Sequence, residues 1–179
     1  MFYVSDIQTT APARFATPLQ ARVYAHLQAA GVAFERVDTD EAISMADCRL
    51  INEQLGVEMV KTLLLCNRQQ TAFYLLVTTA DKPFDTKAVS RALGVARLSF
   101  APADALHARL GTTVGAATVF GVLLDPERQV QVVVDEEVAA RRWYGCSDGT
   151  TTGYLKLPSA WVLREFLEQA QHPPAIICL

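Results

Sequence analysis

Two apolar runs in the first half of the chain dominate its pattern of hydrophobic and polar positions. The runs Val60–Cys66 and Phe73–Val77 are joined by the polar link Asn67–Gln70. Two short apolar runs around a tight polar link predict a β-hairpin in a sheet that is buried on at least one face. Lys61 stands in the first run, where its ammonium would lose hydration and need a partner or a ligand, or else lose its proton. Lys61 is therefore a candidate functional residue, against the alternative of a lysine whose charged end reaches water.

Helices are predicted where apolar residues recur every three or four positions between capping residues. Thr17 before Pro18 marks a helix start, and Gly31 marks the end of the same helix. Asp40 and Ser44 both offer caps for a second helix. The helices predicted after the first one cover residues 46–55, 87–93, 102–110 and 161–170.

The remaining apolar runs predict strands, at 34–38, 97–100, 153–157 and 175–178. The runs 118–124 and 130–135 flank the turn Asp125–Arg128 and predict a second hairpin. Because helices and strands interleave while consecutive strands often form hairpins, we expect an α+β fold with a mixed, mostly antiparallel sheet flanked by helices. We see no repeat or linker, and therefore expect one domain over residues 1–179, with an irregular segment at 1–17.

Composition narrows the class of protein. The 179 residues are 51% hydrophobic and 20% charged, as in an ordinary folded globule. No apolar stretch approaches the roughly 20 residues of a membrane span, and the first residues lack the pattern of a secretory signal, so we expect a cytoplasmic protein. The net charge of −3 argues against binding nucleic acid by bulk charge. Local basic clusters at 82–97 and at Arg141-Arg142 are solvated faces or local patches.

The cysteines and histidines do not form a recognisable site. The four cysteines (Cys48, Cys66, Cys146 and Cys178) lack the C-x-x-C spacing of metal or redox sites, and the three histidines are scattered. We expect no metal and no cofactor. Cys146 is disfavoured as a nucleophile because no histidine lies near it in sequence to lower its pKa.

Two loops rich in small or hydroxylated residues are candidates for ligand binding. In Gly111–Gly121, glycine and alanine would let a ligand approach the backbone, although the spacing is not that of a phosphate-binding loop. Tyr144–Gly153 combines the turn signal Asp148-Gly149 with three threonines. Asp148 could accept a hydrogen bond from an ammonium, either that of Lys61 or that of a substrate. The alternative for the first loop is tight packing under a sheet, and for the second it is an ordinary turn.

Together these segments resemble the YbaK/ProX family of free-standing aminoacyl-tRNA deacylases, which includes the prolyl-tRNA editing proteins. The matching stretches are Val60–Leu65, Lys87–Phe100, Gly111–Asp125 and Asp148–Thr152, and the similarity covers roughly residues 18–178. Their order and spacing are more specific than any one motif. The ProX-type branch is the most similar, and its usual substrate is alanine mischarged on proline tRNA.

The resemblance implies a mixed-sheet α+β fold, no metal, and water attack on the ester to the terminal ribose. The tRNA 3′ end would be the partner, with prolyl-tRNA synthetase as a further one; oligomeric state is left open. The site would comprise Lys61 as the charge-stabilising catalytic residue, Gly115, Ala116, Ala117 and Thr118 as the pocket lining, and Asp148 and Thr151 to orient the substrate amino group or the water. An ester needs only charge stabilisation and a positioned water, so such a site suffices without a protein nucleophile.

The sequence departs from the family pattern in both loops. Val114 and Val119 stand where family members commonly have proline, Ala116 stands in place of serine, and the segment around Asp148 lacks the histidine of ProX-type proteins. These changes favour an alternative function, in which the same fold binds an amino acid or aminoacyl group without hydrolysing it. The retained Lys61 opposes that alternative. A third possibility is a tRNA-binding or synthetase-partner protein without pocket chemistry, which would need a continuous basic face.

Overall fold

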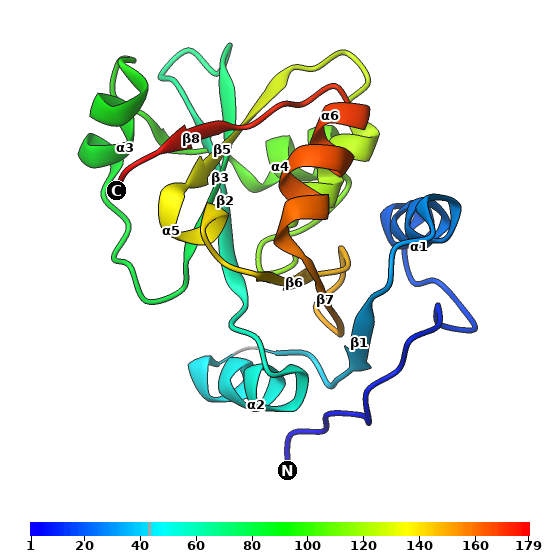
Figure 1. The fold of residues 1–179 in the computed structure, drawn as a ribbon. Helices are drawn as coiled ribbons and strands as arrows, with labels where there is room; N and C mark the ends of the chain where they lie inside the picture. The colour runs from blue at the N-terminus through cyan, green and yellow to red at the C-terminus, as the bar shows by residue number, and fades with distance from the viewer. Residues whose placement is uncertain (43) are drawn as a thin grey trace.

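The computed structural model describes residues 1–42 and 44–179, which form two β-sheets surrounded by helices (Figure 1). Two of the helical segments are not α-helices: η1 is a 3₁₀-helix and η2 a π-helix. In chain order the elements are α1 (Pro18–Ala30), β1 (Glu35–Asp38), α2 (Met45–Leu55), β2 (Val60–Cys66), β3 (Phe73–Thr79), α3 (Thr86–Leu93), β4 (Ser99–Phe100), α4 (Ala103–Leu110), η1 (Val119–Leu124), β5 (Val130–Asp135), α5 (Glu136–Ala139), β6 (Trp143–Ser147), β7 (Gly153–Pro158), η2 (Trp161–Phe166), α6 (Leu167–Gln169) and β8 (Ala175–Ile177).

The larger sheet has five strands in the order β4-β2-β3-β5-β8, and the smaller sheet has three in the order β1-β7-β6. The hairpin predicted around Lys61 is confirmed: β2 and β3 are antiparallel, and Lys61 lies opposite Thr78. β5 pairs in parallel with β3 and with β8, whereas both pairings of the smaller sheet are antiparallel. The predicted α+β class with a mixed, mostly antiparallel arrangement is thus confirmed.

The capping residues that the sequence indicated set several helix ends. The Thr17 side chain accepts a hydrogen bond from the backbone N–H of Gln20 at the start of α1, and Gly31 ends that helix with a left-handed φ of 64°. Ser44 and Asp47 form a reciprocal capping box at the start of α2. Local sequence chemistry therefore determines where these helices begin and end.

The second predicted hairpin is wrong, because residues 119–124 form the 3₁₀-helix η1 instead of a strand. The Thr118 hydroxyl accepts a hydrogen bond from the backbone N–H of Phe120, which starts the helical turn. Gly121 packs so closely on α4 that a Cβ there would lie 2.8 Å from the Cβ of Leu110. A short apolar run is compatible with either a strand or a buried helix, and here the run packs against α4 as a helix.

The segment 144–153, which the sequence suggested was a loop, begins as strand β6 and forms a hairpin with β7. The loop proper is the turn at 148–152. An isolated parallel bridge between Met59 and Gly145 joins this hairpin to the start of β2. Position 145 requires glycine because residues 58 and 59 approach it closely. A Cβ there would lie 2.7 Å from Met59 Cε and 2.9 Å from the Glu58 carbonyl oxygen.

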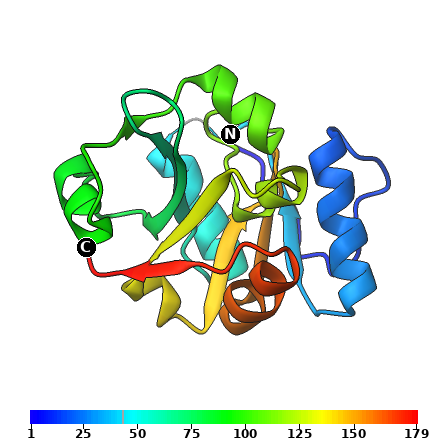
Figure 2. The same cartoon turned by 90° about the horizontal axis from the view of Figure 1, so that it is seen from above.

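The β2 strand separates two hydrophobic clusters. Leu64 and Cys66 belong to the larger cluster, which includes residues of α1, η1 and η2. Leu63 and Leu65 project from the other face into a smaller cluster with residues of α3 and β8. Seen from above, α1 and α3 lie on opposite sides of the molecule (Figure 2). Because side chains alternate along a strand, Lys61 shares the face of the smaller cluster.

Candidate functional site

Lys61 lies near the start of β2, where its ammonium reaches the loop that follows β3. The side chain is half-buried and donates a hydrogen bond to the backbone carbonyl of Lys82. No other hydrogen bond or ion pair of this ammonium occurs among residues 1–42 and 44–179. Lys61 is therefore a half-buried cation with a single hydrogen bond within the described residues.

The loop that accepts this hydrogen bond is fixed by a network with residues of β3, the end of β5, α5 and the segment after β8. The Lys82 ammonium lies 2.8 Å from Asp135 Oδ2 and 2.9 Å from Glu137 Oε1, and it donates to the Leu179 carbonyl at 2.9 Å. Thr78, the residue opposite Lys61, donates its hydroxyl proton to the same Asp135 oxygen at 2.8 Å. This network holds the Lys82 carbonyl in place and thereby positions Lys61.

The two charges at the centre of the network stabilise each other. Burial alone would raise the pKa of Asp135, but hydrogen bonds from Lys82 and Thr78 outweigh it and hold that pKa below its ordinary value. Burial alone would lower the pKa of Lys82, but Asp135 and Glu137 outweigh it and raise that pKa. Both groups are consequently charged at neutral pH.

A small pocket of about 250 Å³ opens on the same face of the larger sheet. Its walls are mostly apolar and include Leu76, Phe84 and Val89, with the side chains of Thr78 and Lys82 as polar members. Lys61 adjoins it through its strand partner Thr78 and through its hydrogen bond to Lys82. Lys61 is thus bonded to one wall residue of a small, mostly apolar cavity and paired with another, but it does not line the cavity itself.

The small-residue loop folds against the turn that carries Asp148. The Thr112 hydroxyl lies 2.9 Å from the Ala116 carbonyl oxygen and 3.4 Å from that of Gly149. Gly115 has a φ of 90°, which L side chains rarely adopt, and a Cβ there would lie 3.9 Å from Thr151 Cγ2. Of the predicted pocket residues, Ala116 and Thr118 are buried, Ala117 is half-buried and Gly115 is exposed.

Asp148 is buried and its carboxylate is occupied by hydrogen bonds from the protein. Oδ2 accepts from Gln20 Nε2 at 2.8 Å and from the Tyr24 hydroxyl at 3.0 Å, while Oδ1 accepts from the Thr150 hydroxyl at 2.8 Å and from its backbone N–H at 3.2 Å. A Cβ on Gly153 would lie 2.2 Å from Oδ2, so the turn encloses the carboxylate. In this structure Asp148 is bonded to α1 and to its own turn, and not to Lys61.

The predicted site residues therefore fall into two neighbouring groups. Asp148, Thr151 and the loop around Gly115 and Ala116 lie together, and the bridge between Met59 and Gly145 brings the start of β2 alongside the strand that leads into Asp148. Lys61 lies two residues after that bridge, with its ammonium at the Lys82 loop. Sequence reasoning did not single out Gln20, Tyr24, Lys82 or Asp135 as members of a site, because their contacts join segments far apart in the chain.

Cys146 has the environment of a packing residue. It is buried, and burial raises the pKa of its thiol well above the ordinary value. A neutral thiol in such a place is a poor nucleophile. In the described part of the chain, no group of three or more His, Cys, Asp or Glu side chains is arranged to hold a metal ion.

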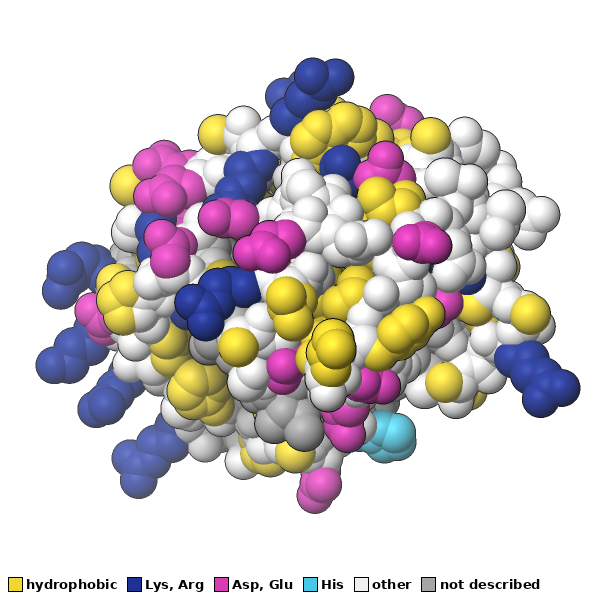
Figure 3. Space-filling model, turned by 90° about the horizontal axis from the view of Figure 1, so that it is seen from below, with side chains coloured by type: hydrophobic (Ala, Val, Ile, Leu, Met, Phe, Trp, Pro, Cys, Tyr) yellow, Lys and Arg dark blue, Asp and Glu magenta, His cyan; other side chains and the backbone are white. Residues whose placement is uncertain are grey.

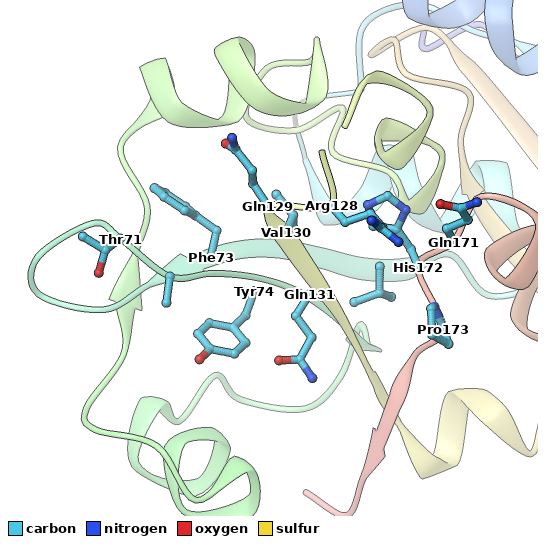
Figure 4. A pocket seen from close by; sticks show the side chains of 12 residues that line it. Thr71, Phe73, Tyr74, Arg128, Gln129, Val130, Gln131, Gln171, His172 and Pro173 are labelled. Carbon is cyan, nitrogen blue, oxygen red and sulfur yellow. The ribbon is translucent and has the colours of Figure 1, made fainter. Parts of the chain in front are cut away.

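A second and larger pocket of about 390 Å³ lies at the other end of β3 (Figure 4). Phe73 and Tyr74 line it with Gln131 from β5 and with His172, whose Nε2 lies 3.0 Å from Asp125 Oδ2. Phe73 and Thr78 are five positions apart, about 17 Å along a strand. This pocket is therefore distant from Lys61.

Comparison with known proteins identifies the family. The family profile of the aminoacyl-tRNA editing domain matches residues 39–164. The chain belongs to this family. The resemblance seen in the sequence is thus confirmed for the editing domain, whose matched range contains Lys61, the small-residue loop and Asp148 but not α1.

Two curated relatives of the editing domain align with two thirds of this chain. Prolyl-tRNA editing protein ProX of Acetoanaerobium sticklandii is 30% identical over 119 residues, which are 66% of this chain and 73% of ProX. Prolyl-tRNA synthetase associated domain-containing protein 1 of Danio rerio is 31% identical over 121 residues, which are 66% of this chain and 65% of that protein.

Solved structures share the editing-domain fold. Hypothetical protein APE2540 superposes with a TM-score of 0.63 at 19% identity, covering 87% of this chain and 98% of its own. A protein described as a trans-editing enzyme for prolyl tRNA synthetase has a TM-score of 0.63 at 17% identity, covering 92% and 99%. At these identities the likeness concerns the fold alone. Within the described residues of the editing domain, no helix has the length and apolar character needed to cross a membrane.

Proposed function

We propose that this protein is a trans-acting aminoacyl-tRNA deacylase that hydrolyses mischarged tRNA, with alanyl-tRNA(Pro) as the expected substrate and without a metal. The observation that carries the proposal is the setting of Lys61 within an editing domain. Its ammonium donates a hydrogen bond to the backbone carbonyl of Lys82, and Lys82 lines a small, mostly apolar pocket. The relatives named for prolyl-tRNA editing support the choice of tRNA.

The chemistry requires stabilisation of one developing negative charge. Water attacks the ester carbonyl carbon, the carbonyl oxygen becomes an oxyanion, and the intermediate collapses to the free amino acid and the ribose hydroxyl, which takes the proton lost by the water. We assign oxyanion stabilisation to Lys61, since a preorganised cation in a partly dehydrated site lowers the barrier to ester cleavage. The Asp135–Lys82 network holds the loop to which Lys61 is bonded.

The walls of the pocket support an apolar amino acid. They are mostly apolar and therefore suit an uncharged side chain, such as that of alanine, better than a charged one. A separate editing enzyme is useful for such a substrate, because a synthetase pocket rejects a smaller apolar amino acid by only about 1–3 kcal/mol. We infer that the protein acts in the cytoplasm on the aminoacylated 3′ end of tRNA, alone or with prolyl-tRNA synthetase.

A second candidate function is binding of an amino acid or aminoacyl group without hydrolysis. The state of Asp148 favours it, because each oxygen of the carboxylate accepts two hydrogen bonds from the protein. A carboxylate so occupied is a poor acceptor for the proton of an attacking water. The two functions differ in whether the ester bond is broken.

The test is deacylation of proline tRNA charged with alanine, serine or cysteine, by the wild type and by Lys61→Ala. The matched control is Lys87→Ala, which removes an exposed lysine from α3. We expect the wild type and the control to release alanine and Lys61→Ala to lose this activity. If the wild type leaves all three esters intact, with and without prolyl-tRNA synthetase, the deacylase proposal fails for these substrates and binding without hydrolysis takes its place.

A further inference from the structure

A pocket of about 470 Å³ lies between α5, the end of β7, η2 and β8, outside the site described above. Its charged lining residues are Arg141, Arg142 and Arg164, and no aspartate or glutamate lines it. Ser159 adds a hydroxyl, and the other walls are alanine, proline, leucine and isoleucine. In a chain with a net charge of −3, a cavity lined by three arginines and no acid is a local concentration of positive charge.

Much of this charge is not neutralised by the protein. Neither Arg142 nor Arg164 forms an ion pair within residues 1–42 and 44–179. Arg141 donates from Nη2 to Glu58 at 3.0 Å, while its buried Nη1 has no hydrogen-bond partner. The hydroxyl of Ser159, a residue only 2% exposed, also lacks one. Buried donors without acceptors are costly, so these groups favour a ligand that brings acceptor oxygens.

The face of the molecule shown in Figure 3 has a mixed distribution of charge. There, acidic and hydrophobic side chains occupy much of the centre, and Lys and Arg side chains project mainly at the edges. A continuous basic face, which binding by bulk charge would require, is not present on that side. The arginine pocket instead offers a compact group of cations, the arrangement that suits a few phosphate groups.

Trp143 directly follows the pocket residue Arg142 in the chain. Trp143 is 37% exposed, and the guanidinium carbon of Arg142 lies 5.3 Å from its ring centre. Lys156 Nζ lies 5.1 Å from the same centre and pairs with Glu35 at 3.0 Å. Cations combined with a partly exposed aromatic ring are typical of surfaces that bind single-stranded nucleic acid, where bases stack on the ring and phosphates meet the cations.

The arginine pocket is linked to the surroundings of Lys61. Arg141 contacts Glu58, three residues before Lys61 in the chain. Lys82, whose carbonyl binds Lys61, pairs with Glu137 on α5, the short helix that leads to Arg141. A polynucleotide with its 3′ end at Lys61 could therefore reach the pocket with its neighbouring phosphates.

We propose that the arginine pocket binds backbone phosphates of the acceptor arm of tRNA, with Arg142 and Arg164 as the principal contacts and Trp143 as a stacking surface. The proposal rests on the proposed function for the identity of the RNA, but it does not require that the ester be cleaved. Three arginines without an acid favour phosphates over the mixed charges of a protein surface.

The first test is the affinity for uncharged proline tRNA, measured by fluorescence anisotropy at several salt concentrations. We compare the wild type with the double variant Arg142→Gln/Arg164→Gln, and the control is Arg49→Gln/Arg68→Gln, which removes two exposed arginines from α2 and the β2–β3 turn. The pocket variant should bind at least about tenfold more weakly and lose about two units of the salt-dependence slope, while the control binds like the wild type. Trp143→Ala should weaken binding without changing that slope.

Three results would overturn the proposal. The first is tRNA binding by the pocket variant that equals that of the wild type. The second is displacement of tRNA by micromolar inorganic phosphate, which would assign the pocket to a small phosphate ligand. The third is loss of binding to prolyl-tRNA synthetase with tRNA binding unchanged, which would make the pocket a protein interface.

A second measurement separates this inference from the proposed function. The pocket variant should raise the KM for alanyl-tRNA(Pro) and leave cleavage of the alanyl ester of adenosine unchanged, because that substrate lacks the neighbouring phosphates. Equal loss on both substrates would contradict phosphate binding at the pocket. If the wild type cleaves neither ester but binds tRNA through Arg142 and Arg164, the deacylase proposal fails while the assignment of the pocket stands.

Discussion

Lys61 and Asp148 are the two charged residues that the sequence predicted for the candidate site, and the structure holds them in different ways. The Lys61 ammonium is half-buried and bonded to one backbone carbonyl, whereas the Asp148 carboxylate is buried and accepts four hydrogen bonds. A charge with few protein contacts can interact with a ligand, while a fully bonded charge holds segments together. Under the proposed function, this difference fits a chemical role for Lys61 and a structural role for Asp148.

The Lys82–Asp135 network, which holds the loop bonded to Lys61, has a structural role like that of Asp148. Asp135 is buried and joins the Lys82 loop to β3, as Asp148 joins its turn to α1. Each carboxylate therefore organises the backbone near one half of the candidate site. Substitutions at Asp148, Asp135 and Tyr24 should separate these structural roles. They should differ in how much they lower the free energy of unfolding and in how that loss depends on pH.

The largest change in stability is expected for Asp148→Asn. The new amide would direct an N–H₂ group at donors from Gln20 or Thr150, leaving buried polar groups without acceptors, and should lower the free energy of unfolding by about 3 kcal/mol. Urea denaturation measures this loss of unfolding free energy. Asp6→Asn is a control, since Asp6 is exposed. A loss below about 1 kcal/mol would show that the carboxylate is not needed to join α1 to the turn.

A smaller change, which depends on pH, is expected for Asp135→Asn. The folded-state pKa of Asp135 is lowered, so its stabilisation is present at neutral pH and is lost as the pH falls below about 4. The variant should be less stable by about 2–3 kcal/mol at pH 7 and should lose less stability on acidification than the wild type. Urea denaturation between about pH 3 and 7 checks both points, and identical acid profiles would contradict the account.

The smallest change is expected for Tyr24→Phe, which deletes one of the four hydrogen bonds to Asp148. The ring stays packed in the larger hydrophobic cluster, so the loss of unfolding free energy should be about 1 kcal/mol. Tyr3→Phe, at an exposed tyrosine, is the matched control. If Tyr24→Phe costs as much as Asp148→Asn, the hydroxyl rather than the whole carboxylate cluster joins α1 to the turn.

Much of the fold could be predicted because local chemistry determines it. The helix ends at Thr17, Gly31 and Ser44 and the hairpin around Lys61 follow from capping and alternation, and the structure confirms them. The strand predicted at 118–124 is wrong, because a short apolar run carries no periodicity that separates a strand from a buried helix. The parallel pairing of β3 with β5 depends on contacts across the sheet that no local pattern specifies.

The candidate site could be predicted in part for the same reason. Lys61 stood out because a lysine in an apolar strand is unusual, and the loops stood out by composition. The partners of Asp148 did not, because Gln20 lies 128 residues and Tyr24 lies 124 residues away from it in sequence. The Asp135–Lys82 pair likewise spans 53 residues. These contacts arise from tertiary packing, and the local sequence of each segment does not indicate them.

The most direct test of the central claim is the rate of deacylation of alanyl-tRNA(Pro) by Lys61→Met, measured beside its free energy of unfolding. Methionine keeps an unbranched apolar stem and removes the charge. The account predicts that kcat falls by about 10²–10³-fold while the unfolding free energy changes by less than about 1 kcal/mol. Undiminished activity, or a loss of activity matched by a loss of stability, would show that Lys61 does not supply the charge that the reaction needs.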